Sequence, residues 1–405
     1  MQQRSVVKVG ASLLIASLAL SACGSRNNSS TTTSNGNKTA TIGVMAPLSG
    51  DLSALGLGIQ HSVELAVKQA NANNAIPGWT LKVDPKDDEG KPDVGKNAAT
   101  AFAGDANVAG VVGNLNSSVS QSTQPVLATA KIVQVSPANT NPTLTQGANF
   151  ATAPVRTYAT YFRTCTTDAV QGPFAARYLF QKAGIKKVAT IHDKKTYGQG
   201  LVAAFTTEFK KLGGIITDAE TINPDESNYQ AVISKVKPTA PQAVYYGGEY
   251  PQAGPLSQQM KAAGLNVPLM GGDGIYDPKF ITLAGATANG DLATSVGAPT
   301  DSLAAGKKFL ADYAAAGYKE PAAAYGAYSY DAANAIINAL KVSLKGAKDV
   351  SSSRQATIDA LGKVSFEGVT GPVAFDKFGD TTSRVLTVYK VTDLKWVPVL
   401  TEAFK

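Results

Sequence analysis

The residues with the clearest capacity for chemistry stand directly after short apolar runs. Asn114, Asn116 and Ser117 follow one such run, and a helical pattern begins where they end. Free N–H groups in the first turn of a helix bind anions such as carboxylates. The alternative is that Ser117 only caps the helix, as serines after strands commonly do. The segment is therefore a candidate carboxylate site.

Similar polar residues follow two other apolar runs. Ala138 and Thr140 come shortly after the run that ends at Ser136, and Asp273 stands in the Gly-rich stretch MGGDG. A buried Asp beside hydroxyl groups suits a ligand ammonium group, whereas its alternative role is an Asx-turn. Strand ends that carry hydroxyls and free amides can converge on one small polar ligand.

Catalytic and metal chemistry have little support in the sequence. Two Cys and two His, without CxxC or HExxH spacing, cannot form a four-ligand zinc site unless carboxylates join them. Asp376, Gly379 and Asp380 miss the spacing of the twelve-residue calcium loop, so we expect a turn there. A hydrolase built on His192 and its neighbour Asp193 would lack a GxSxG elbow. We therefore predict a protein that is not an enzyme and uses no metal or cofactor.

The N-terminus predicts export. Residues 1–22 have the pattern of a secretion signal, with basic residues before an apolar stretch too short to span a bilayer. The letters LSAC ending at Cys23 resemble the lipobox of bacterial lipoproteins, whose Cys is lipidated and becomes the first residue of the mature chain. Residues 23–39 contain no large apolar side chain and predict a flexible tether. We expect an extracytoplasmic protein anchored to the cell membrane through Cys23.

The charge balance of the remaining chain is close to neutral. The 405 residues include 37 Lys and Arg against 30 Asp and Glu, and four of the basic residues lie within the first 39 positions. Without a clustered basic face, we expect no nucleic-acid partner. Because lipidation would occupy Cys23, Cys165 has no partner and is predicted to be a lone buried thiol.

From residue 40 onward, short β-branched runs alternate with amphipathic helical patterns. The runs predict strands at residues 40–46, 79–83, 108–113, 131–136, 187–192 and 242–247, and helices are expected near 56–72 and from about Gln199. This alternation predicts doubly wound, mostly parallel α/β sheets. The strands exceed one comfortable open sheet, so we expect two lobes with a ligand between their strand ends. After residue 365, alternation at period two around a Gly/Asp turn predicts a hairpin.

Several of these segments together resemble a known family. They are IGVMAPLSGDLSALG, GNLNSSVSQSTQPV, VSPANTNPTLT, IHDKKTYGQGL, VYYGGEYPQAG and MGGDG, in this order along the chain. They are similar to the leucine/isoleucine/valine-binding proteins of ATP-driven importers, which have the type I periplasmic-binding-protein fold. The resemblance runs from about residue 40 to 390 and implies a solute-binding protein.

The resemblance also implies which residues contact the ligand. By motif, Ser117, the backbone N–H of Ala138 and the Thr140 hydroxyl would hold an α-carboxylate, and Asp273 would hold an α-ammonium where the family usually has Glu. Tyr197 would line the binding cleft from the second lobe. An α-amino acid is therefore the ligand that the resemblance favours.

Two departures from the family put the side-chain pocket in doubt. Leu55 stands where the branched-chain binders carry Trp, and Glu249 where they carry Tyr. A Glu249 that faces the cleft without a partner would favour a ligand with a cationic or hydrogen-bond-donating side chain, because an unpaired buried carboxylate is costly. A Glu249 that faces solvent would leave Leu55 lining an apolar pocket. Three tyrosines match the family's aromatic cleft wall or belong to the core: Tyr325, Tyr328 and Tyr330.

The resemblance further implies three crossings of a hinge, near residues 161, 295 and 372. Lobe 1 would then comprise 40–161 and 295–372, and lobe 2 would comprise 162–294 and 373–405. Its partners would be an amino acid, an ABC permease and the ATPase subunits of that permease, and the protein itself is predicted to be a monomer. Alternative functions are a ligand-sensing surface receptor of the same fold, or a binder of a small amide such as urea or of an aromatic acid.

Overall fold

The computed structural model describes residues 37–405. The predicted signal peptide at 1–22, the lipidation site Cys23 and the tether up to residue 36 lie outside the described residues. The tether was predicted to end at residue 39, but the first strand already begins at Lys38. Within 37–405, none of the helices combines the length and apolar character needed to cross a membrane.

The first lobe is built on a parallel sheet of five strands in the order β2-β1-β3-β4-β5. These are β1 (Lys38–Ala46), β2 (Trp79–Asp87), β3 (Val108–Gly113), β4 (Val133–Ser136) and β5 (Tyr161–Arg163). The helices of this lobe are α1 (Ser53–Ala72), α2 (Pro92–Gly104), α3 (Ser117–Thr129), α4 (Thr143–Gln146), α10 (Ala304–Ala315), α11 (Gly326–Ser343) and α12 (Arg354–Leu361). The predicted strand at 108–113 is confirmed with the same bounds, and the one at 131–136 begins two residues later.

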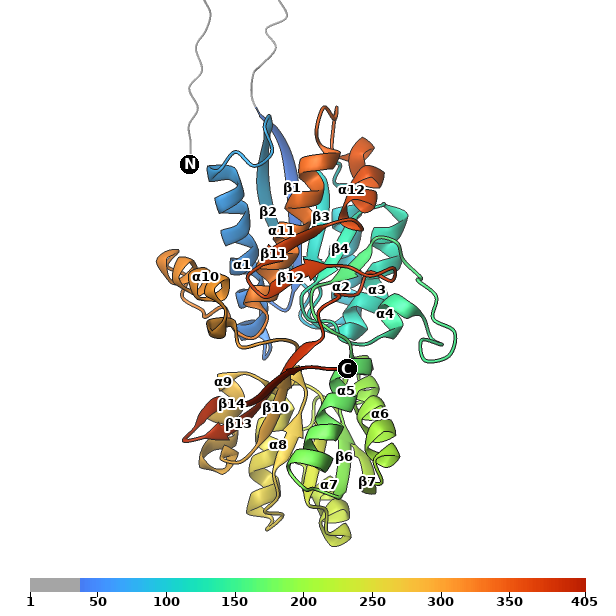
Figure 1. The fold of residues 1–405 in the computed structure, drawn as a ribbon, viewed down its shortest axis with the longest axis vertical. Coiled ribbons are helices and arrows are strands. Elements are labelled where there is room, and N and C mark those ends of the chain that lie inside the picture. Colours follow the sequence, from blue (N-terminus) through green and yellow to red (C-terminus); the bar gives the residue numbers. More distant parts are fainter. Residues whose placement is uncertain (1–36) are drawn as a thin grey trace, which may run out of the picture. The chain divides into compact units, whose positions relative to one another are not determined.

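Successive residues of each strand explain why helices cover both faces of this sheet (Figure 1). Met45 packs in one cluster with Phe102 of α2, whereas its neighbour Val44 packs in another with Ile59 of α1. Because neighbouring side chains of a strand point to opposite faces, a strand that is apolar at every position must be covered twice. The uninterrupted apolar runs therefore specify a doubly wound sheet.

The second lobe has a seven-stranded sheet in the order β14-β13-β10-β9-β8-β6-β7. Its strands are β6 (Lys187–His192), β7 (Ile215–Thr221), β8 (Ala243–Gly247), β9 (Leu269–Gly271), β10 (Leu292–Ser295), β13 (Val385–Thr392) and β14 (Lys395–Ala403). The helices around it are α5 (Asp168–Arg177), α6 (Thr196–Lys211), α7 (Gln230–Val236), α8 (Tyr250–Ala262) and α9 (Pro278–Ala284). In this sheet β13 pairs antiparallel with both β10 and β14, and the other pairs of neighbouring strands are parallel. The predicted α/β architecture with two mostly parallel lobes is confirmed.

The C-terminal prediction of one hairpin is wrong. The segment forms two hairpins, one from β11 (Ser365–Gly368) and β12 (Gly371–Ala374), the other from β13 and β14. The predicted turn exists between them, because Asp376 Oδ1 accepts N–H bonds from Phe378 and Asp380. However, β12 and β13 on its two sides belong to different sheets, and pairing around the turn is limited to the isolated bridge Phe375–Thr381 and the backbone bonds beside it. Alternation at period two identifies strands but does not name their partners.

The chain passes between the two large sheets three times, after β5, after β10 and after β12. That these passages act as the hinge expected from the sequence stays a prediction. The exact lobe boundaries near residues 161, 295 and 372 stay a prediction.

Candidate functional site

The carboxyl ends of strands from both sheets surround a small cavity of about 10 Å³. Its lining residues are Leu55, Leu115, Asn116, Ser117, Ala138, Tyr197, Glu249, Asp273, Gly274 and Tyr325. Six of the seven predicted ligand-binding residues are in this set, and only Thr140 is not. Loops after parallel strands meet at one edge of a sheet, so residues far apart in sequence come together here.

The first lobe contributes the start of α3 and the loop after β4. Ser117 is the first residue of α3, and both it and Ala138 are buried. The Ala138 N–H donates to Ser136 Oγ over 3.2 Å, a long bond that Ser136 also shares with the N–H of Asn139 at 2.9 Å. Ser117 and the α3 terminus thus carry the unpaired donors at this side of the cavity.

Thr140 lies outside the lining of the cavity. It is fully buried, its carbonyl oxygen accepts the N–H of Asp168 at the start of α5 at 2.7 Å, and its Oγ1 has no hydrogen-bond partner within residues 37–405. Burial, together with the nearby charge of Asp273, raises the pKa of Asp168 to about 8. Spacing along the loop could not predict this contact, because Asp168 comes from a distant segment.

Asp273 is the best-supported charged group in the cavity. Its Oδ1 accepts hydrogen bonds from Tyr197 Oη and Gln171 Nε2, both at 2.9 Å, and its Oδ2 accepts one from Tyr325 Oη at 2.8 Å. Burial raises the pKa of the Asp273 carboxyl, and these three donors oppose that effect. The carboxylate is therefore held in place at the cavity wall with acceptor capacity left on both oxygens.

Close glycine contacts bring Tyr197 to this carboxylate. A Cβ on Gly198 would lie 2.4 Å from the carbonyl oxygen of Gly247, and one on Gly272 would lie 2.4 Å from Tyr197 Oη. Only glycine fits these positions without displacement, so the start of α6 packs directly against the ends of β8 and β9. Sequence reasoning missed Gln171, which joins Asp273 from α5 and has no local signal that marks it.

Glu249 also lines the cavity, but it is not an unpaired carboxylate. Its Oε2 accepts from Lys195 Nζ at 3.0 Å, and its Oε1 accepts from Asn116 Nδ2 at 2.8 Å. Burial opposes ionisation, yet Lys195 holds the pKa of Glu249 below its usual value. Asp193 beside it has a raised pKa because of burial and the charge of Glu249. Neither alternative weighed from the sequence describes this arrangement, because Glu249 lines the cavity and has Lys195 and Asn116 as partners.

The remaining candidates for chemistry lie outside the cavity lining. His192 Nδ1 accepts the N–H of Lys194, and burial lowers the pKa of His192. Cys165 is confirmed as a buried free thiol, and burial raises its pKa. Tyr328 and Tyr330 pack in hydrophobic clusters, whereas Tyr325 reaches Asp273. In the part of the chain that the structure describes, no group of three His, Cys, Asp or Glu side chains is arranged to hold a metal ion.

Comparison with known proteins decides the family. Residues 39–395 match the periplasmic binding protein family. The chain belongs to this family. This family consists of substrate-binding proteins of the extracytoplasmic space rather than enzymes. The resemblance seen in the sequence is confirmed, because relatives in this family are named Leu/Ile/Val-binding proteins.

Relatives of this periplasmic binding protein are similar over most of its length. It is 34% identical to Leu/Ile/Val-binding protein homolog 2 of Brucella abortus, over 84% of this chain and 86% of that protein. Its structure is similar to the branched-chain amino acid transporter substrate-binding protein LivJ of Streptococcus pneumoniae in complex with isoleucine, with a TM-score of 0.78 and 28% identity over 90% of this chain and 99% of that one. It is also similar to the leucine-binding protein LivK of Thermotoga maritima, with a TM-score of 0.79 and 25% identity over 89% of this chain and 98% of that one.

Replacement of Lys195 by Met should destabilise the protein by on the order of 3 kcal/mol at pH 8, since it leaves the buried Glu249 carboxylate without its counter-ion. The loss of stability should be smaller at pH 5. Without Lys195, burial raises the pKa of Glu249, and the carboxyl group takes up a proton. Urea unfolding at both pH values measures the free energy of unfolding. Lys308→Met is the control, because it breaks an exposed pair with Asp312 and should change stability far less than Lys195→Met does. Equal deficits for the two variants would contradict the buried pairing.

The stability of the Asp168→Asn variant relative to wild type should increase progressively as the pH rises from 5 to 8. The pKa of Asp168 is raised to about 8 by burial, so the folded protein binds a proton that the unfolded chain has released, and this contribution to stability is lost as the pH rises. Thermal unfolding of variant and wild type across this range tests it. Asp312→Asn should give a constant difference, since the pKa of exposed Asp312 is lowered and the group stays ionised throughout.

Proposed function

We propose that this protein is an extracytoplasmic lipoprotein that binds an amino acid in the cavity and delivers it to an ABC permease. The observation that carries the proposal is the pairing of two opposite features in one cavity. Asp273 presents a buried carboxylate held by three donors, and Ser117 opens α3, whose N-terminus has no side-chain cap. A carboxylate attracts an ammonium group, and a helix N-terminus attracts a carboxylate. An α-amino acid carries both groups on one carbon.

The side-chain end of the cavity favours an uncharged ligand. Leu55 and Leu115 supply apolar surface, and the nearby Glu249 is neutralised by Lys195. Of this pair only Glu249 lines the cavity, and its oxygens already accept from Lys195 and Asn116, so a cationic side chain finds no unpaired carboxylate and an anionic one is repelled by Glu249. Branched-chain amino acids and neutral polar amino acids of similar size are therefore the proposed ligands, in agreement with the names of the similar proteins.

Binding would be coupled to closure of the two lobes. Tyr325 and Asn116 belong to the first lobe and donate hydrogen bonds to Asp273 and Glu249 of the second. A ligand that contacts both sides favours the closed form by its differential affinity. The closed form would then be the state that the permease recognises. Lipid on Cys23 would keep the protein next to that permease.

A thermal-unfolding screen of the purified protein tests the function. The twenty amino acids should include a few uncharged ones that raise the Tm, because a ligand at 100 times its Kd stabilises the folded state by about 2.7 kcal/mol. Urea and benzoate represent the small amides and aromatic acids. A response to either of these and to no amino acid would overturn the proposal of an α-amino acid ligand.

Variants then test the residues. Asp273→Asn should raise the Kd of the strongest amino acid by at least tenfold in isothermal titration calorimetry, since the ammonium group loses its counter-charge, and Ser117→Ala should weaken binding in the same direction. Asp291→Asn is the matched control, because Asp291 is a buried carboxylate of the same lobe that bonds Lys261 and Ser257 and does not line the cavity. A control that loses as much affinity as Asp273→Asn would contradict the site.

Replacement of Cys23 by Ser should release the protein from the membrane. Wild-type cells should show the protein in the membrane fraction with a lipid mass on its N-terminal residue, because the thiol is the acylated group. The Cys165→Ser variant should stay in the membrane fraction, since Cys165 is buried in the folded body. Wild-type protein without lipid mass would refute the anchor and leave the ligand-binding proposal intact.

A further inference from the structure

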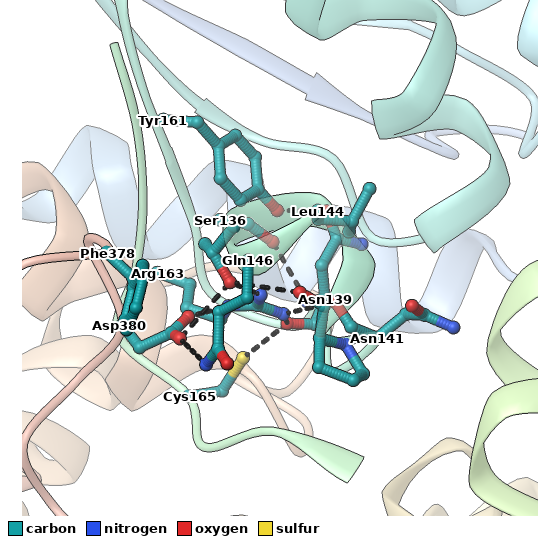
Figure 2. Close-up of polar contacts among 12 residues, drawn as sticks. Ser136, Asn139, Asn141, Leu144, Gln146, Tyr161, Arg163, Cys165, Phe378 and Asp380 are labelled. Atoms are coloured by element: carbon teal, nitrogen blue, oxygen red, sulfur yellow. Dashed lines mark hydrogen bonds and ion pairs between the residues drawn. The ribbon is translucent and has the colours of Figure 1, made fainter. Parts of the chain in front are cut away.

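The guanidinium group of Arg163 is completely buried at the end of β5, next to the first passage between the lobes. Its Nε donates to Asp380 Oδ1 at 2.6 Å, and its Nη1 donates to the carbonyl oxygens of Asn139 at 2.7 Å and Asn141 at 3.0 Å. Its Nη2 donates to Thr145 Oγ1. Figure 2 shows Asp380, Asn139 and Asn141 gathered near Arg163. Arg163 therefore bonds directly to two other segments of the chain.

Asp380 comes from the third passage, between β12 and β13. Besides Arg163, its carboxylate accepts from Gln146 Nε2 at 2.8 Å and from Thr145 Oγ1 at 3.1 Å. A backbone hydrogen bond joins the same two segments, because the N–H of Arg163 donates to the carbonyl oxygen of Gly379 at 3.0 Å. One ion pair thus joins two of the three passages and clamps the loop of residues 137–146 between them.

That loop carries Ala138 and Thr140. Between them, Asn139 is hydrogen-bonded through its carbonyl oxygen and through both polar atoms of its side chain. Its carbonyl oxygen accepts from Arg163, its Nδ2 donates to the carbonyl oxygen of Leu115 at 2.7 Å, and its Oδ1 accepts from Tyr161 Oη at 2.8 Å. Leu115 itself lines the cavity. The position of Ala138 at the cavity wall therefore depends on a backbone that Arg163 holds from behind.

We propose that Arg163, paired with Asp380, is a positioning residue that fixes the 137–146 loop in its ligand-binding geometry and ties this geometry to the hinge. The inference rests on the proposed function, because it assumes that Ala138 contacts the ligand. Separating the two passages would pull Arg163 away from Asp380 and leave each charge buried without its partner, which is strongly unfavourable. Because Arg163 also bonds the loop, such a movement would rearrange the loop as well. Arg163 does not line the cavity and acts on the ligand only through the loop.

The geometry requires arginine rather than any cation. The planar guanidinium directs donors at Asp380, at two backbone carbonyls and at Thr145 at the same time. A lysine ammonium is a single point with three donors and cannot reach all four acceptors in one plane. Arg163→Lys would keep the charge beside Asp380 and lose part of the contact with the loop.

The test combines a local and a functional measurement on the full-length protein. Hydrogen–deuterium exchange of residues 137–147 is followed without ligand, and calorimetry gives the Kd for L-leucine and for the amino acid with the largest Tm shift in wild type. Arg163→Met should speed exchange in this segment and raise the Kd at least tenfold. Arg354→Met is the matched control, since Arg354 is a buried arginine that bonds three carbonyl oxygens elsewhere in the first lobe. It should leave the segment and the Kd unchanged even where it lowers the Tm.

Further variants separate positioning from charge neutrality. Asp380→Asn keeps the shape of the side chain, and it provides the exchange measurement if Arg163→Met fails to fold. The double variant Arg163→Met with Asp380→Asn removes both charges, so its Tm should recover partly while exchange stays fast and the Kd stays high. Wild-type exchange and affinity in the double variant would overturn the inference. If wild type binds no amino acid, the proposed function fails, whereas the exchange result still decides whether the pair holds the loop.

Discussion

A buried carboxylate needs donors, and the region between the two sheets is arranged around this need. Three carboxylates there accept hydrogen bonds from several side chains each. The donors to Asp273 are Tyr197, Gln171 and Tyr325, and those to Glu249 are Asn116 and Lys195. The donors to Asp380 are Arg163, Thr145 and Gln146. In each case at least one donor comes from a segment far away in sequence. An ionised group without partners in a dry interior is strongly destabilised, so each carboxylate fixes the segments that serve it. Satisfying these charges therefore shapes the cavity as much as apolar packing does.

The division of donors and acceptors between the lobes has a consequence for motion. Asp273 and Glu249 stand on the second lobe, while Tyr325 and Asn116 donate from the first. Separation of the lobes would break these bonds and expose both carboxylates to water, which solvates them well. The direct bonds between lobes are thus exchanged for hydration, and their net contribution to closure is small. Under the proposed function, a ligand would shift the equilibrium between open and closed forms with only a few additional contacts.

The sequence predicted the backbone features of the site better than its side-chain partners. Ser117, Ala138 and Asp273 follow strands, and a parallel sheet brings strand ends to one edge, so their convergence on a cavity follows from local pattern and topology. The backbone contact of Thr140 with Asp168 and the pairing of Glu249 with Lys195 depend on contacts between distant segments, which spacing does not encode. The single predicted hairpin failed for the same reason, since strand identity is local and strand partnership is not.

The Glu249–Lys195 pair changes how the cavity can discriminate between ligands. An aromatic side chain at this position would supply apolar area, and selectivity would follow from contact with it. Here the wall is an ion pair whose oxygens are already hydrogen-bonded to Lys195 and Asn116, so an alkyl side chain leaves no charge newly unpaired. A cationic side chain would have to compete with Lys195 and Asn116 for Glu249, and an anionic one would be repelled by Glu249. Under the proposed function, discrimination would therefore come from the penalty imposed on charged ligands, and size selection would fall to Leu55 and Leu115.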